Sequence, residues 1–63
     1  MEYIELNAFI KKKGLAGSGG QAKHIIRSGV VKVNGEVETR NKKKLVNGDK
    51  VEVNGEEFVV SVE

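Results

Sequence analysis

The segment GVVKVNGEVE, residues 29–38, marks the point where the hydrophobic pattern of the chain changes its period. Val31 and Val33 alternate with Lys32, which is the pattern of a half-buried β-strand. Asn34-Gly35 then separates this run from a second alternating run. Asn-Gly favours a type I′ turn, because both central residues of that turn need a positive φ. The segment therefore predicts a β-hairpin.

The same turn chemistry returns toward the end of the chain. Val-Asn-Gly occurs again at residues 46–48 and at residues 53–55. The last copy joins residues 51–53 to residues 58–62 and predicts a second hairpin. The middle copy is followed by Asp49 and predicts a tight turn before that hairpin.

Before residue 29 the apolar side chains follow helical spacing instead. Leu6, Phe9 and Ile10 fall on one face of a helix, which we expect over residues 5–13. Residues 3–4 fit either the start of this helix or a short extended lead-in. The loop that follows is short, so the next helix should pack against this one.

The second predicted helix starts at Ser18 and ends at Gly29. Ser18 as N-cap with Gln21 three residues later is the pattern of a capping box. One face of this helix is apolar, and Lys23 and Arg27 lie one turn apart beside it, facing outward. Together these patterns predict a single α+β domain over residues 1–63, with two packed N-terminal helices followed by a small, mostly antiparallel sheet of hairpins.

The amino-acid composition argues against a disulfide, a metal site and most kinds of catalytic site. The 63 residues contain no Cys and one His, His24, so neither a disulfide nor a clustered metal site is expected. A lone exposed His is more often a solvated residue or a phosphate neighbour than a general base. Residues 17–20 are glycine-rich before a helix, but they lack the Lys-Ser/Thr ending of a phosphate-binding loop and a preceding strand. We expect no enzyme activity, no cofactor and no small-molecule substrate.

No apolar run reaches the length that spans a bilayer, about 20 residues, and the chain does not open with a signal-peptide pattern. We therefore expect a soluble cytoplasmic protein without membrane contact.

Positive charge is concentrated in the middle of the chain. Residues 11–44 hold ten Lys and Arg but only two acidic residues, a net charge of +8, whereas the two ends together carry −6. Lysines at the end of a helix are common for structural reasons, so residues 11–13 alone carry little weight. Residues 39–44, called the basic loop below, contain no apolar residue, and we expect them to be an exposed loop or an irregular sheet edge. The whole set favours a surface that binds nucleic acid.

The aromatic residues bear on the kind of nucleic acid. Tyr3, Phe9 and Phe58 are the only aromatic side chains, and we expect two of them in the core. A protein that binds single strands needs exposed rings on which bases stack. We therefore expect contacts with phosphates and with the shape of a folded RNA. Two alternatives stay open: a winged-helix-like DNA binder, and a protein-interaction module that uses an open sheet edge or the acidic ends.

The order of these elements resembles a known module, the αL RNA-binding domain, also called the S-four domain. The resemblance covers almost the whole chain, and it is closest to the stand-alone bacterial form, the YbcJ-like group. The residues that carry it are Ser18, Gln21-Ala22-Lys23, Ile25-Ile26, Gly29-Val30-Val31-Lys32-Val33-Asn34-Gly35 and Gly48-Asp49.

This resemblance implies an RNA face made of the second helix, its N-terminal turn and the basic loop. Carried over to this chain, that face comprises Ser18, Lys23, Arg27, Lys32, Arg40, Lys42, Lys43 and Lys44. Peripheral positions are Lys13, Gly19, Gly20, Gln21 and His24. Many members of the family have Arg directly after the Ser, whereas this chain has Gly19, so the usual charge at the helix start is missing. We expect a monomer that binds structured RNA, ribosomal or tRNA-like, in association with the ribosome.

Overall fold

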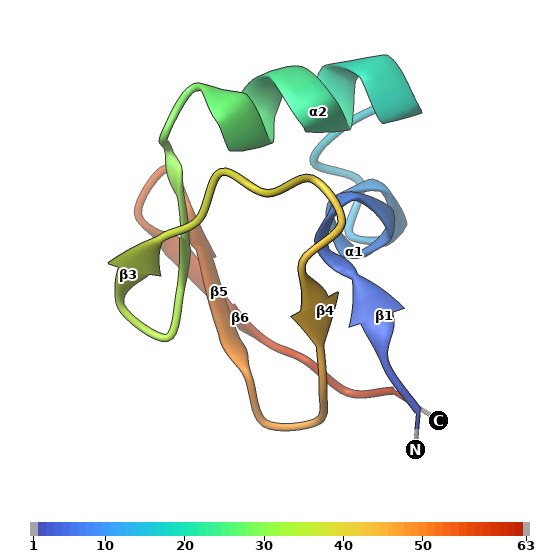
Figure 1. The fold of residues 1–63 in the computed structure, drawn as a ribbon, viewed down its shortest axis with the longest axis vertical. Helices are drawn as coiled ribbons and strands as arrows, with labels where there is room; N and C mark the ends of the chain where they lie inside the picture. Colours follow the sequence, from blue (N-terminus) through green and yellow to red (C-terminus); the bar gives the residue numbers. More distant parts are fainter. Residues whose placement is uncertain (1, 63) are drawn as a thin grey trace.

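The computed structural model describes residues 2–62 and contains two helices and six strands in that range (Figure 1). In chain order these elements are β1 (Ile4–Glu5), α1 (Leu6–Lys12), α2 (Gly19–Arg27), β2 (Val31–Val33), β3 (Glu36–Val37), β4 (Lys44–Leu45), β5 (Lys50–Val53) and β6 (Glu56–Val59).

The strands form two antiparallel sheets. The larger sheet has the order β3-β2-β5-β6, and the smaller one pairs β1 with β4. The helices α1 and α2 pack against each other. The expected α+β class, with two packed helices followed by an antiparallel sheet of hairpins, is confirmed.

The helix ends follow the predicted caps with small shifts in length. α1 is one residue shorter at each end than the expected range 5–13, because Glu5 and Lys13 occupy its cap positions. Of the two readings of residues 3–4, the extended one is right for Ile4, which pairs with Leu45 in the smaller sheet. α2 begins after the N-cap Ser18 and ends before Gly29, which has a φ of +85°.

Both hairpin turns have the predicted backbone. Asn34 and Gly35 have φ values of +52° and +87°, and Asn54 and Gly55 have φ values of +51° and +85°. Positive φ at both central residues is the requirement of a type I′ turn. The strand that follows the second turn differs from the expected range 58–62, because β6 starts earlier and ends at Val59.

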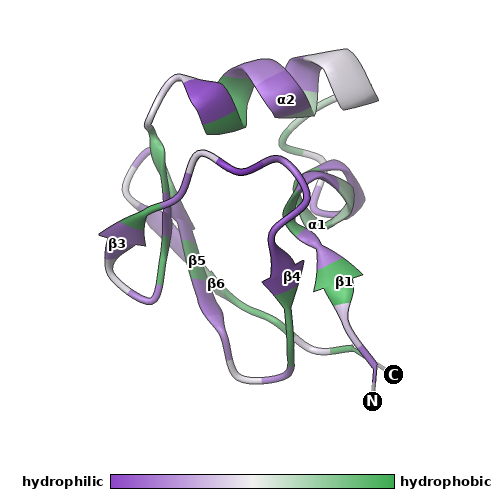
Figure 2. Ribbon diagram, in the orientation of Figure 1, coloured by the Kyte–Doolittle hydropathy of each residue, from purple (hydrophilic) through white to green (hydrophobic). Residues whose placement is uncertain are grey.

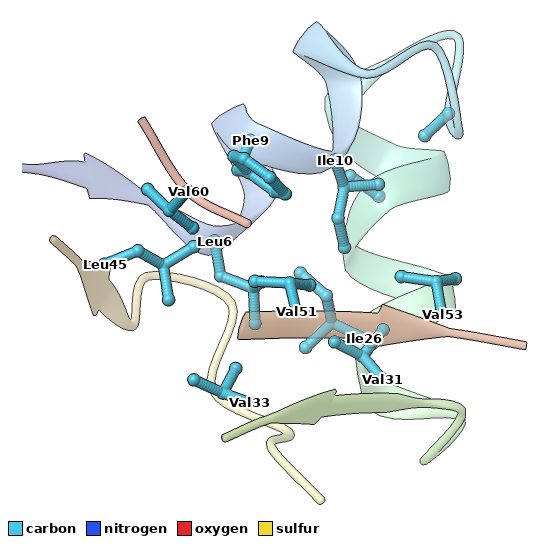
Figure 3. Close-up of a cluster of buried hydrophobic side chains, with 12 residues drawn as sticks. Leu6, Phe9, Ile10, Ile26, Val31, Val33, Leu45, Val51, Val53 and Val60 are labelled. Carbon is cyan, nitrogen blue, oxygen red and sulfur yellow. The ribbon is translucent and has the colours of Figure 1, made fainter. Parts of the chain in front are cut away.

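The core lies between the two helices and one face of the larger sheet (Figure 3). Its fully buried side chains come from every layer: Leu6, Ile10, Ile26, Val31, Leu45, Val51 and Val60. Phe9 is buried and Phe58 packs against the cluster, as expected of two of the three aromatic residues. Neither described helix is long and apolar enough to cross a membrane.

The Val-Asn-Gly and Gly-Asp motifs hold the hairpins to each other. The side chain of Asn34 donates from Nδ2 to Oδ1 of Asp49 (3.2 Å), and its Oδ1 accepts from the backbone N–H of Lys50 (3.0 Å). The other carboxylate oxygen of Asp49 accepts from the N–H of Val46 (2.9 Å), which closes the tight turn expected at residues 46–49. These motif residues therefore have an architectural role in fixing the register of the sheet.

We expect the substitution Asp49→Ala to lower the free energy of unfolding by about 1–3 kcal/mol, since two hydrogen bonds are lost. Urea denaturation followed by circular dichroism would measure this loss. Glu57→Ala removes an exposed carboxylate from β6 and is the matched control; it should leave the midpoint unchanged or raise it slightly, because Glu57 lies opposite Glu52. Equal midpoints for Asp49→Ala and the control would contradict the architectural role.

Candidate nucleic-acid interface

The start of α2 is capped by Ser18, which the resemblance implies in the RNA face, and Gln21, which it implies at the periphery. Ser18 Oγ accepts a hydrogen bond from the backbone N–H of Gln21 (3.2 Å), so the predicted N-cap is confirmed. Gln21 Oε1 in turn accepts from the N–H of Gly17 (2.7 Å), one residue before the position that a standard capping box would use. Both side chains are exposed but already hydrogen-bonded within the protein.

The outward side of α2 carries the paired cations. Ala22 and Ile26 are buried against the core, whereas Lys23 and Arg27, four residues apart, are exposed. His24 is exposed as well. A side chain at Gly19 would meet no heavy atom within 4 Å, so packing does not demand glycine at the position where the family resemblance implies Arg.

The basic loop is fastened to the start of α1 by its backbone. The N–H of Leu6 donates to the carbonyl of Lys43 (2.8 Å), and the N–H of Asn7 donates to the carbonyl of Asn41 (3.0 Å). These are among the first amides of α1, which find no acceptor within their own helix, and the side chain of Glu5 does not cap them. The loop therefore acts as the cap of α1.

The attachment to α1 makes the basic loop less exposed than expected. We expected the whole segment 39–44 to be exposed, but Asn41 and Lys43 are half-buried, and Lys44 is the first residue of β4. Figure 2 shows the segment as a hydrophilic strip that runs below α2 in that view. Its conformation is thus set by contacts with α1 and β1, which lie far away in the sequence.

The cationic side chains of the basic loop line one depression in the surface: Arg40, Lys42, Lys43 and Lys44. Lys44 also places its Nζ 5.0 Å from the centre of the Tyr3 ring, within the range of a cation–π contact. The side chain of Tyr3 is exposed.

Arg40 makes a close ion pair with Glu38. Its Nε and Nη2 donate to Oε2 and Oε1 of that carboxylate at 2.9 and 3.1 Å, and its backbone N–H donates to Oε2 at 3.0 Å. The pKa of Glu38 is lowered from 4.5 to about 2, chiefly by the side-chain hydrogen bond from Arg40, against the opposing effect of burial. The backbone N–H of Arg40 and the charges of Arg40 and Lys43 contribute to the lowering. Because the folded-state pKa is the lower one, the pair stabilises the fold above pH 4.5, and this contribution is lost as the pH falls toward 2.

Lys32 is not brought together with the other cations. Val31 and Val33 point into the core, so Lys32 between them points to the opposite face of the sheet. There it lies between Val37 on β3 and Glu52 on β5. Lys13 sits at the far end of α1, with its Nζ 5.6 Å from the centre of the Phe9 ring.

Sequence reasoning passed over Glu38 as a site residue. The available signal was an acid two residues before Arg40 in the most basic part of the chain. Within residues 2–62 no group of three or more His, Asp or Glu side chains is placed to hold a metal ion.

The chain belongs to the S4 domain family, whose sequence model matches residues 1–61. The resemblance to the S-four domain is therefore confirmed. Among its relatives are two bacterial proteins named YbcJ: "Putative RNA-binding protein YbcJ" of Escherichia coli K12 and "Uncharacterized protein YbcJ" of Shigella flexneri. Each is 45% identical to this chain over 53 residues, which cover 84% of this chain and 76% of the relative.

Proposed function

We propose that this protein binds structured RNA, ribosomal or tRNA-like, without catalysing a reaction. Membership in the S4 domain family and the name of the Escherichia coli relative support RNA as the ligand. The observation that carries the proposal further is the depression lined by four cations of the basic loop. Phosphate oxygens match this chemistry, because Lys supplies point charges and Arg supplies a planar pair of donors.

The proposed surface has two parts. Lys23 and Arg27 on α2 form a paired anchor for one stretch of backbone, and the basic loop receives a neighbouring stretch. Ser18 and the exposed positions at the start of α2 lie at the periphery, since the side chains of Ser18 and Gln21 are occupied in the cap. Lys32, on the far face of the sheet, would contribute only if the RNA wraps around the edge at β3.

Backbone fastening supports this assignment of the basic loop. A loop held by hydrogen bonds to α1 loses less conformational freedom on binding than a free one. We expect few hydrogen bonds to base edges, because few exposed Asn or Gln side chains accompany these cations. Recognition would therefore depend on the spacing of phosphates in a folded RNA. We further propose that the protein acts as a monomer in the cytoplasm, in association with the ribosome.

Fluorescence anisotropy with three labelled probes tests the proposal: an RNA hairpin, a DNA duplex of the same stem sequence, and an unstructured RNA. We expect the hairpin to bind most tightly. Six phosphate contacts would weaken its binding by about a thousandfold between about 50 and 200 mM salt. Preference for the DNA duplex would favour the winged-helix-like reading, and no binding to any probe at low salt would leave a protein-interaction module.

A further inference from the structure

The ion pair between Glu38 and Arg40 is unequal in exposure. The side chain of Glu38 is 14% exposed and that of Arg40 is 70% exposed. Oε2 of Glu38 accepts two hydrogen bonds and Oε1 accepts one, all from Arg40. The backbone N–H of Glu38 donates to the carbonyl of Val31 (2.9 Å), which fixes the carboxylate-bearing residue at the end of β3. The carboxylate is thus committed, whereas much of the guanidinium stays open to solvent.

The hydrogen atoms that remain free point to a second ligand. Glu38 takes the Nε–H and one N–H of Nη2, which together form one edge of the guanidinium. Among residues 2–62, no acceptor takes the two N–H groups of Nη1 or the second one of Nη2, which lie at the outer end of the guanidinium. That end presents parallel donors of the kind that bind phosphate oxygens in a two-point contact.

We propose that Glu38 is a positioning residue for RNA binding, which holds Arg40 so that its free edge faces a phosphate in the depression of the basic loop. This inference rests on the proposed function. Glu38 adds a negative charge to the surface, but it orders a long side chain before the RNA arrives. Ordering Arg40 in advance removes part of the entropic cost of binding.

The pair contributes to stability, but the guanidinium of Arg40 is 70% exposed, so solvent screening limits that contribution. An acid inside the most basic part of the chain also weakens the field that attracts RNA. The low pKa of Glu38, about 2, keeps the carboxylate ionised at any pH at which RNA binding is measured. We therefore interpret the pair as a means of orienting Arg40. The gain in RNA affinity from this orientation is expected to exceed the loss caused by the negative charge of Glu38.

The substitution Glu38→Gln gives a test in which two hypotheses predict opposite signs. Glutamine keeps one acceptor for the backbone N–H of Arg40 but cannot hold the side chain at two points. We expect affinity for the RNA hairpin to fall by about three- to tenfold, the range for losing one preordered side chain, although the net charge rises. If Glu38 only opposes the RNA, affinity must rise instead, and that result overturns the proposal.

Two controls sharpen this test. Glu36→Gln makes the same change of charge at an exposed position of the same hairpin and should bind RNA as tightly as the parent or slightly more tightly. In an Arg40→Gln background, Glu38→Gln should cause no further loss, because the side chain to be positioned is gone. A loss as large as in the parent background would overturn the positioning role.

A spectroscopic measurement separates this role from a general structural one. The Nε–H resonance of Arg40 should be resolved and protected in the parent and lost in Glu38→Ala, which removes both acceptor oxygens, with the amide spectrum away from residues 38–40 unchanged. An unprotected resonance in the parent would contradict the inference. Failure of the parent itself to bind the RNA hairpin would instead refute the proposed function, so the two failures are distinguishable.

Discussion

A variant with Lys42, Lys43 and Lys44 all replaced by glutamate should lose detectable binding to the RNA hairpin. The substitution turns three attractive charges in the depression into three repulsive ones. The fold should survive, because the hydrogen bonds that fasten this segment to α1 use the backbone carbonyls of Asn41 and Lys43 and no lysine side chain. A gel-shift titration at low salt measures the binding, and far-UV circular dichroism checks the fold.

A milder pair of variants shows whether position or total charge is responsible. Glutamine at residues 42–44 removes the same charge as glutamine at Lys11, Lys12 and Lys50, which are exposed at the end of α1 and on β5. The first variant should lower the slope of log affinity against log salt by about 2–3, if each lysine meets one phosphate. The second should change that slope little. Equal slopes would remove the basic loop from the site.

The second large effect concerns the core. Ile26 of α2 is fully buried, and Figure 3 shows its side chain in the same cluster as those of Val31 and Val51. We expect Ile26→Ala to reduce the free energy of unfolding by about 2–5 kcal/mol, from lost transfer energy and the cavity left behind. A domain of this size has only about 3–9 kcal/mol in total. We therefore expect a large fraction of this variant to be unfolded at or near room temperature.

The neighbouring residue Ile25 provides the control for Ile26→Ala. It belongs to the same apolar stripe in the sequence, but it is only half-buried in the structure. Ile25→Ala should therefore be clearly less damaging in urea unfolding, and Ile26→Val should cost about 0.5–1.5 kcal/mol. If Ile25→Ala is as damaging as Ile26→Ala, the assignment of the buried face of α2 is wrong.

The local elements could be predicted because their signals lie within a few residues. Asn34-Gly35 and Asn54-Gly55 favour a turn with positive φ at both residues when they lie between alternating segments, and the structure has these values. Ser18 similarly marks the start of α2, because its hydroxyl accepts from the backbone N–H of Gln21, only three residues away. In each case the side chain and the group that it satisfies are close in sequence, so tertiary packing had little to change.

The missed features depend on contacts between distant segments. Nothing near Ile4 indicates that its partner is Leu45, or that carbonyls of the basic loop cap the first amides of α1. A count of charges treats each residue as independent, so it did not predict the pairing of Arg40 with Glu38. The alternation that predicted the first hairpin also implied that Lys32 points away from Val31 and Val33. We grouped the cations by their position in the sequence and did not use this information.

The capping of α1 by carbonyls of the basic loop has a consequence for how this protein can diversify. Every residue type carries the same peptide carbonyl, so the attachment places few demands on which side chains occupy positions 42 and 44. Evolution or a designer can exchange those side chains, and so retune which ligand is preferred, while the scaffold beneath stays intact. The side chains at positions 42 and 44 can therefore vary without loss of the hydrogen bonds that attach the segment to α1.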